Sequence, residues 1–248
     1  MVFSGRVYET DGAQAIGVYE ADAVRPLSPV PQPTSLRLFR HDAQMPSTSG
    51  PLPEEPSFFY GNPGCLVSAS QLVNHPEFTP ELGFDPYLGV VLVADAYKID
   101  VEQADEAILG FTILNLLVAR DVERIERQFG LGYGRSHDIG AAFGPVITTP
   151  DELEDVATSV GDGKGYQLSV VTRVNGVEIA RGNVDDLPFT AAQAISAASQ
   201  SCTLRSGDLF ALGPLVSEGD EPVNLRAADE VQVSVEILGT LSLKLNQI

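Results

Sequence analysis

The chain has 248 residues, 44% of them hydrophobic and 20% charged, and its 34 acidic side chains against 15 basic ones give a formal net charge of −19. This composition predicts a soluble, well-cored protein and excludes nucleic-acid and anionic membrane partners, because both require a basic face. Two cysteines are too few for a disulfide framework, and the N-terminus lacks the pattern of a secretion signal, so we expect a cytoplasmic protein.

The first 55 residues differ in composition from the rest of the chain. Weak alternation of apolar and polar residues over 2–19 predicts a small hairpin. Eight prolines follow in residues 25–56, and because proline fixes φ and removes a hydrogen-bond donor, we expect an irregular arm there. The chain is thus predicted to divide into a small N-terminal β or irregular arm, residues 1–55, and a main domain, residues 56–248.

The main domain is predicted to be built mostly from strands. The apolar runs Leu88–Ala94 and Phe111–Ala119 are typical of strands buried on both faces. Between them, Ile99–Leu109 has helical spacing, with Asp100 as its N-cap and Gly110 at its end. Further segments predict a helix over 120–129, a hairpin over 166–180 that turns at Asn175-Gly176, a helix over 189–199, and strands over 209–212, 230–237 and 241–245.

The histidines give no sign of a metal centre. His41, His75 and His137 each lie apart from other residues that commonly bind metals, and no His-Glu-x-x-His motif is present. His41 is followed by Asp42, which could orient it as a general base, although a surface histidine beside an acid is the commoner arrangement.

Two charged segments follow the second buried strand. The alternating charges of residues 120–127 are typical of a solvated helix face with weak ion pairs. Arg135-Ser136-His137-Asp138 follows a loop with three glycines and combines a cation, a hydroxyl, an imidazole and a carboxylate. Such a set suits an enolate or carboxylate ligand.

Seven segments, from about Phe58 to the C-terminus, resemble motifs of the fumarylacetoacetate hydrolase superfamily in their order along the chain. They are Phe59-Tyr60-Gly61-Asn62-Pro63, Asp85-Pro86-Tyr87-Leu88-Gly89-Val90-Val91-Leu92, Gly110 to Asp121, Gly134-Arg135-Ser136-His137-Asp138 with Gly144-Pro145, Val174-Asn175-Gly176 with Arg181-Gly182-Asn183, Ser206-Gly207-Asp208 with Gly213, and Gly239-Thr240-Leu241. The resemblance implies an α+β, mostly β fold, in which a mixed β-barrel or β-roll C-terminal domain forms a homodimer.

The resemblance also implies a position for a metal ion. In this superfamily Mg²⁺ or Mn²⁺ is held by the two glutamates of a Glu-x-Glu motif and by the aspartate of an Asn-Asp pair. Asp85, Tyr87 and Leu116 occupy those positions here. Because hard cations require oxygen ligands and a leucine supplies none, we expect neither a metal nor another cofactor.

Other positions of the family's pocket have changed in the same direction. Asn62 and Arg135 stand where the family has lysines, and threonines are replaced by Val184, Leu212 and Pro214. The glycines and the hairpin of the framework remain. The pocket is therefore predicted to be more apolar than the family pattern.

The preferred hypothesis is a metal-independent enzyme of specialised metabolism that acts as a cyclase, isomerase or lyase on a bulky, enolisable or polyene-type small molecule. In such a reaction the protein would supply shape, orientation and a few hydrogen bonds. The candidate catalytic residues are Arg135 as the electrostatic anchor, Tyr87, Asp85, Glu123 and His137. The candidate substrate-binding residues are Tyr60, Asn62, Leu116, Ser136, Val184, Leu212 and Pro214.

Two alternatives stay open. One is a metal-dependent hydrolase, hydratase or decarboxylase of a 2-oxo or 1,3-dicarbonyl acid, which would use Mg²⁺ or Mn²⁺ at a rebuilt site. The other is a non-catalytic binding protein that keeps this fold.

Overall fold

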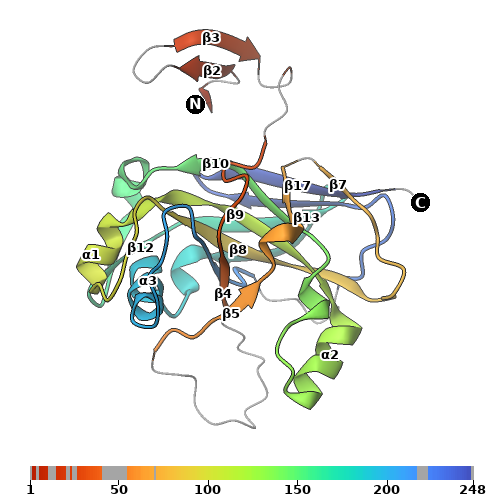
Figure 1. Cartoon of the computed structure of the whole chain (residues 1–248). Coiled ribbons are helices and arrows are strands. Elements are labelled where there is room, and N and C mark those ends of the chain that lie inside the picture. The colour runs from red at the N-terminus through yellow and green to blue at the C-terminus, as the bar shows by residue number, and fades with distance from the viewer. Residues whose placement is uncertain are drawn as a thin grey trace.

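The computed structural model describes residues 2–3, 6–10, 15–20, 23, 27–40, 55–69, 71–216 and 223–246. Its strands are Val2–Phe3 (β1), Arg6–Thr10 (β2), Ala15–Glu20 (β3), Leu36–Arg40 (β4), Phe59–Gly61 (β5), Leu66–Ser68 (β6), Leu72–Val73 (β7), Leu82–Leu92 (β8), Ile108–Ala119 (β9), Ala141–Thr148 (β10), Ala157–Val160 (β11), Gly163–Tyr166 (β12), Ser169–Val174 (β13), Val177–Asn183 (β14), Leu209–Gly213 (β15), Glu230–Val235 (β16) and Gly239–Leu245 (β17). Its helices are Val101–Glu106 (α1), Arg120–Phe129 (α2) and Ala191–Ser199 (α3), with 3-10 turns at Pro63–Cys65 (η3), Arg135–His137 (η4), Pro150–Val156 (η5) and Val184–Asp186 (η6). This mostly β architecture, shown in Figure 1, confirms the predicted fold class.

Two sheets form the body of the molecule. The larger has the strand order β5-β4-β15-β8-β9-β10-β6, and the smaller has the order β14-β13-β16-β17-β7. β1–β3 form a separate three-stranded sheet, and β11 and β12 form a hairpin. No helix in the described part of the chain is long and apolar enough to cross a membrane.

Each face of the large sheet supports its own apolar cluster. Because side chains alternate along a strand, neighbouring residues of β8 belong to different clusters. The first cluster packs Leu88 and Val90 against α3 and the five-stranded sheet. The second cluster contains Tyr87, Leu114 and Leu116. A one-residue shift of β8 against β9 would exchange the two sets of side chains, so burial on both faces fixes this register.

Several local predictions are confirmed in detail. Asp100 caps α1 as predicted, by accepting a hydrogen bond from the backbone of Gln103 at 2.8 Å. The structure adds a cap that was not predicted, Thr190 at the start of α3. Asn175 and Gly176 both have positive φ, as a type I′ turn requires. The predicted helix over 99–109 is too long, because α1 ends at Glu106 and Ile108 already pairs in β9.

The proline-rich segment is more regular than its composition suggests. Leu36–Arg40 forms β4, which lies in register beside β15 inside the large sheet. The prediction of an irregular arm over 25–56 is therefore wrong for these five residues, whose apolar positions are buried in the sheet. The domain boundary near residue 55 stays a prediction.

Pro86 lies in the middle of β8, where a proline would normally remove a ladder hydrogen bond. Its carbonyl accepts a hydrogen bond from the backbone of Leu215 at 2.8 Å, so its imide nitrogen points toward the same edge of the strand. The pairing of β15 with β8 ends at Leu212, opposite Leu88, before it reaches Pro86. The missing donor is tolerated because no ladder partner requires it there, and β8 continues through Asp85 and Tyr87.

Candidate functional site

β8 and β9 bring the three positions of the implied metal site together. Asp85 lies opposite Leu116, and Tyr87 lies opposite Leu114, in an antiparallel ladder. Opposed residues of such a ladder project from the same face, so Asp85, Tyr87 and Leu116 share the face of the second apolar cluster. Tyr87 and Leu116 are fully buried, and Asp85 is only 4% exposed.

Two arginines form ion pairs with the Asp85 carboxylate. Arg120, the first residue of α2, places Nη2 2.6 Å from Oδ1 of Asp85. Arg40, the last residue of β4, places Nη1 3.3 Å from Oδ2. Both oxygens of this buried carboxylate are therefore engaged by guanidinium groups.

Glu123 forms ion pairs with the same two arginines and with a third. Its carboxylate lies 2.7 Å from Arg40, 3.2 Å from Arg120 and 3.1 Å from Arg127. Arg120, Glu123 and Arg127 share one face of α2 because they are spaced by three and four residues. The prediction that residues 120–127 form a solvated face is wrong for this side of the helix, where Glu123 is buried. The opposite side is exposed and carries Ile125 and the ion pair of Arg124 with Glu81.

A hydrogen-bonded chain continues from Arg40 through His137. Nε2 of His137 lies 3.1 Å from Nη1 of Arg40, and Nδ1 lies 2.7 Å from Oγ of Ser136, whose hydroxyl also contacts the Glu126 carboxylate. A guanidinium only donates and a carboxylate only accepts, so Nε2 of His137 accepts from Arg40, Nδ1–H donates to Ser136, and Ser136 donates to Glu126. We call Asp85, Glu123, Glu126, Arg40, Arg120, Arg127, Ser136 and His137 the Arg40 cluster.

The pKa values of the cluster follow from burial and from these charges. Burial alone would raise the pKa of Asp85, but Arg120 and Arg40 outweigh it and lower that pKa to about 2. Burial lowers the pKa of His137 to about 3, although Asp85 acts in the opposite direction. Burial and the Asp85 carboxylate raise the pKa of Tyr87 far above its ordinary value. At neutral pH the Asp85 carboxyl is therefore ionised, the His137 imidazole is neutral, and the Tyr87 phenol keeps its proton.

Aromatic rings lie next to the cluster. The ring of Tyr133 is 4.8 Å from the ring of His137 and 5.2 Å from the Arg40 guanidinium. Phe59 packs against Tyr133 and, edge-on, against His137. Tyr133 belongs to the glycine loop that follows α2, in which Gly130 and Gly132 have positive φ, and its ring lies beside His137.

Tyr60, Asn62 and Arg135 were also predicted as site residues, but they lie outside the cluster. Tyr60 is 61% exposed, and the Arg37 guanidinium lies 5.4 Å from its ring. Asn62 caps η3 and donates to Asp138 at 2.6 Å. Arg135, the expected anchor, is exposed with its guanidinium 4.3 Å from the ring of Phe78, and only its backbone reaches Glu126.

The predicted apolar lining is divided between the two faces of the large sheet. Leu116 lies beside Asp85, whereas Leu212 and Val184 belong to the first cluster and line a small cavity of about 30 Å³ on the other face. Pro214 follows β15 and is half-buried. The structure does not bring these four residues to one pocket, and their contact with a substrate stays a prediction.

The fold and this arrangement can be set beside known proteins. Residues 35–246 match the fumarylacetoacetate (FAA) hydrolase C-terminal domain. The chain belongs to this family. The match covers most of the chain, including β4 and both sheets of the body, and confirms the resemblance drawn from the seven segments.

Relatives with an assigned activity in this family are enzymes. The chain is 28% identical over 234 residues to the oxaloacetate tautomerase YisK of Bacillus subtilis, spanning 91% of this chain and 74% of that protein. It is 30% identical over 194 residues to a 2,4-didehydro-3-deoxy-L-rhamnonate hydrolase of a Sphingomonas species, spanning 77% and 65%. The crystal structure of a 5-carboxymethyl-2-hydroxymuconate delta-isomerase from Mycobacterium smegmatis superimposes with a TM-score of 0.75 at 21% identity, covering 98% of this chain and 94% of the other.

The donor set of this family member does not fit the implied divalent metal. Of the three positions, Leu116 has no donor atom, Tyr87 is a buried neutral phenol, and both Asp85 oxygens are held by arginine. Among the described residues no group of three or more His, Cys, Asp or Glu side chains is arranged to hold a metal ion. Two guanidinium groups at this position would also repel a dication.

The sequence indicates Asp85, Glu123, Ser136 and His137 as site residues, but it gives no sign of the arginines that join them. Arg40 directly precedes the His41-Asp42 pair, which lies outside the described residues, and nothing in the sequence links it to Asp85. Arg120 belongs to the family-like segment Gly110 to Asp121, but no role was predicted for it. Glu126 belongs to the alternating charges of residues 120–127, which predict a solvated face.

Proposed function

We propose that this family member is a metal-independent enzyme that moves a proton on an enolisable carbonyl compound, as an isomerase or tautomerase. The observation that carries this proposal is the Arg40 guanidinium, which lies between Asp85 and Glu123 beside the expected metal position. A guanidinium donates hydrogen bonds and carries a fixed positive charge, so it can stabilise a developing enolate in place of a metal.

Arg40 is suited to this role by its surroundings. Burial works against the charge on Arg40, but Asp85, Tyr87 and Glu123 together hold its pKa above the ordinary value. The group is therefore a permanent cation in a water-poor site, where a hydrogen bond to a developing oxyanion is stronger than in water.

His137 supplies the proton acceptor once a substrate is bound. In the free protein its Nε2 accepts a hydrogen bond from Nη1 of Arg40. A substrate carbonyl oxygen that takes this place on Arg40 frees the Nε2 lone pair next to the substrate's α-carbon. The α C–H bond then breaks, its proton goes to Nε2, its electron pair forms the enolate, and return of the proton to oxygen or to another carbon gives the isomer.

Among the reaction types expected from sequence, proton transfer is the one that the Arg40 cluster supports directly. A tautomerase and an isomerase among the relatives support the same class. Cyclisation or lyase chemistry on a bulky polyene would depend on pocket shape, and the candidate lining residues lie on two faces of the sheet. The expected homodimer stays a prediction.

The test is an assay of EDTA-treated protein on enolisable probes, beginning with the keto-enol interconversion of oxaloacetate followed by absorbance. We expect a rate that is unchanged by EDTA and not raised by Mn²⁺. Loss of activity with EDTA and its return with Mn²⁺ would instead establish the metal-dependent alternative.

Matched arginine variants locate the activity. Arg40→Lys keeps the charge but loses the planar fork, and we expect kcat to fall about 100-fold, a typical loss for one oxyanion donor. Arg124→Lys changes an exposed arginine on the neighbouring helix and should leave kcat unchanged. Equal rates for both variants would remove Arg40 from the reaction.

A non-catalytic binding protein is the second candidate, because every candidate base in the Arg40 cluster already has a partner. It predicts saturable binding of enolisable carbonyl compounds with no turnover of any of them. Direct binding measurements on the same probes separate it from the enzyme.

A further inference from the structure

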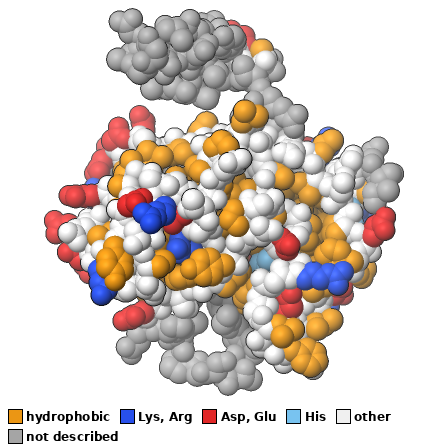
Figure 2. All heavy atoms as spheres, in the orientation of Figure 1, with side chains coloured by type: hydrophobic (Ala, Val, Ile, Leu, Met, Phe, Trp, Pro, Cys, Tyr) orange, Lys and Arg blue, Asp and Glu red, His pale blue; other side chains and the backbone are white. Residues whose placement is uncertain are grey.

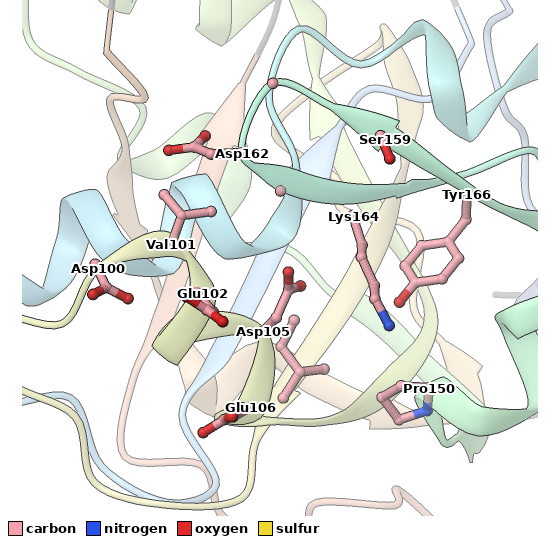
Figure 3. A pocket seen from close by; sticks show the side chains of 13 residues that line it. Asp100, Val101, Glu102, Asp105, Glu106, Pro150, Ser159, Asp162, Lys164 and Tyr166 are labelled. Carbon is pink, nitrogen blue, oxygen red and sulfur yellow. The ribbon is translucent and has the colours of Figure 1, made fainter.

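A second group of charged side chains lies far from the Arg40 cluster, between α1 and the β11–β12 hairpin. There the structure has a pocket of about 790 Å³, shown in Figure 3. Figure 2, in the orientation of Figure 1, shows acidic side chains gathered along the edge of the molecule where α1 and β12 lie. None of the residues that line this pocket belongs to the family motifs described above.

The charge of the pocket is one-sided. Its carboxylates are Asp100, Glu102, Asp105, Glu106 and Asp162. The one ammonium group of its lining, Lys164, pairs with Glu154 at 2.9 Å, and Glu154 is not part of the lining. Within the described residues, no arginine or lysine forms an ion pair with the five carboxylates. The lining of the pocket therefore has an excess of acidic over basic side chains.

Helix α1 concentrates this charge on one side. Glu102, Asp105 and Glu106 are separated by three and four residues, so their side chains share one face of the helix. Like charges at this spacing destabilise a helix in isolation. A bound cation would relieve that repulsion.

Tyr166 is an independent indication of a ligand. It is 95% buried, with its ring edge-on to Phe111 at 5.0 Å, yet its hydroxyl lines the pocket and has no hydrogen-bond partner among the described residues. Figure 3 shows the hydroxyl turned toward the end of the Lys164 side chain. Burial, Asp105 and Glu154 raise the pKa of Tyr166 to about 12, so the hydroxyl keeps its proton at neutral pH.

Apolar surface completes the pocket. Val101, Ile108 and Pro150 line it beside the carboxylates. Lys164 and Tyr166 also line the small cavity that Leu212 and Val184 line. These two residues therefore connect the charged pocket with an apolar cavity. A ligand that matches this lining combines a positive nitrogen with a short aliphatic chain.

We propose that this pocket binds an organic ammonium ion, namely an aliphatic amine whose charged nitrogen lies at the Asp105 side of α1 and whose chain packs on Val101 and Ile108. A metal ion is disfavoured, because no three ligating side chains of the described residues converge on one point. An anionic ligand is disfavoured by the five carboxylates. The proposal is independent of the function proposed for the Arg40 cluster.

The test is isothermal titration of the full chain with 1,4-diaminobutane at about 0.15 M salt, where long-range attraction to the acidic protein is screened. We expect one binding site per chain. Asp105→Asn should weaken binding about tenfold, because it removes a charge next to the amine. Tyr166→Phe should weaken it about fivefold through the loss of one hydrogen bond.

Glu77→Gln is the matched control, because Glu77 is an exposed acid that does not line the pocket. It removes the same charge and should leave the Kd within about twofold. Equal weakening by Glu77→Gln and Asp105→Asn would overturn the proposal, since binding would then follow net charge alone. Absence of binding, or a Kd that neither pocket variant changes, would overturn it as well. Circular dichroism of each variant confirms that the comparison is made between folded proteins.

Discussion

The Arg40 cluster and the α1 pocket are both rich in charged side chains, but they balance their charges differently. In the cluster, three carboxylates meet three guanidinium groups in a buried region where Asp85 and Glu123 are at most 5% exposed. In the pocket, five acidic residues line an open space, and the ammonium of Lys164 is paired with Glu154 outside the lining. The acids of the cluster are paired with arginines, whereas the lining of the pocket has more acidic than basic side chains.

This difference shows where the net charge of −19 acts. At the family's metal position the acids are few and are already neutralised by arginine. Among the described residues, five other acids line the cavity at α1, where we propose that an ammonium ion binds. The net charge of a chain therefore does not indicate the charge at the family's metal position. That local charge depends on the partners of each buried group.

The largest effect should come from breaking the cluster. Glu123→Gln removes the carboxylate shared by Arg40, Arg120 and Arg127 and leaves buried positive charge without its partner. We expect the free energy of unfolding to fall by about 3–5 kcal/mol, measured by urea denaturation. Glu81→Gln, at the exposed pair with Arg124, should cost about 0–1 kcal/mol. Similar losses for the two variants would show that the cluster is solvated.

The second effect is a loss of stability in acid. The unfolded chain protonates its histidines near pH 6.5, while the pKa of His137 in the folded protein is about 3, so protons favour the unfolded state between these values. The contribution of His137 to the free energy of unfolding is fully present above pH 6.5 and is lost as the pH falls toward 3. Asp85, with a pKa of about 2 against 3.8, adds a further loss of about 2 kcal/mol below pH 4.

Unfolding free energies measured from pH 8 to pH 4 check this prediction. His137→Gln should flatten the slope between pH 6.5 and pH 4, where the histidine acts. His75→Gln, a change at a half-buried histidine that contacts Pro76 and Leu225 instead of the cluster, should keep the slope. A wild-type curve that is flat down to pH 4 would contradict the buried neutral imidazole.

A smaller effect concerns Tyr87, a member of the second apolar cluster that lies on the same sheet face as Asp85. Its hydroxyl is buried and has no hydrogen-bond partner among the described residues. Tyr87→Phe removes this unsatisfied group and fills the same space, so we expect stability to stay constant or to rise by up to about 1 kcal/mol. A loss of more than about 1 kcal/mol in thermal or urea unfolding would show that the hydroxyl is satisfied after all.

Sequence patterns predicted most of the fold because they report local physics. The apolar runs predicted the C-terminal part of β8 and most of β9, Asp100 caps the helix expected after it, and Asn175-Gly176 turns the hairpin. β4 was not predicted, because its short apolar pattern is surrounded by prolines. Its structure depends on a parallel partner, β15, which is about 170 residues later in the chain.

The site was less predictable, for a similar reason. The resemblance placed Asp85, Tyr87 and Leu116 together, and the β8–β9 register does so. The partners of Asp85 could not be predicted, because Arg40 reaches it from another strand and a charged residue on a helix has the same pattern whether it faces water or a buried acid. Distances between segments remote in sequence decide which of the two occurs.

The smallest expected effect tests the other side of the comparison. Burial raises the pKa of Asp105, and the nearby Lys164 only partly opposes this, so the folded protein holds the Asp105 proton more tightly than the unfolded chain does. Its contribution is therefore favourable in acid and is lost as the pH rises through the range where the carboxyl ionises. At pH 7 the charged form opposes folding slightly, and Asp105→Asn should raise stability by less than about 1 kcal/mol, since the group is partly solvated. Urea denaturation at pH 7 against Glu77→Gln measures this difference. A clear destabilisation by Asp105→Asn would mean that Asp105 already has a strong partner, and the α1 pocket would then be balanced in the same way as the Arg40 cluster.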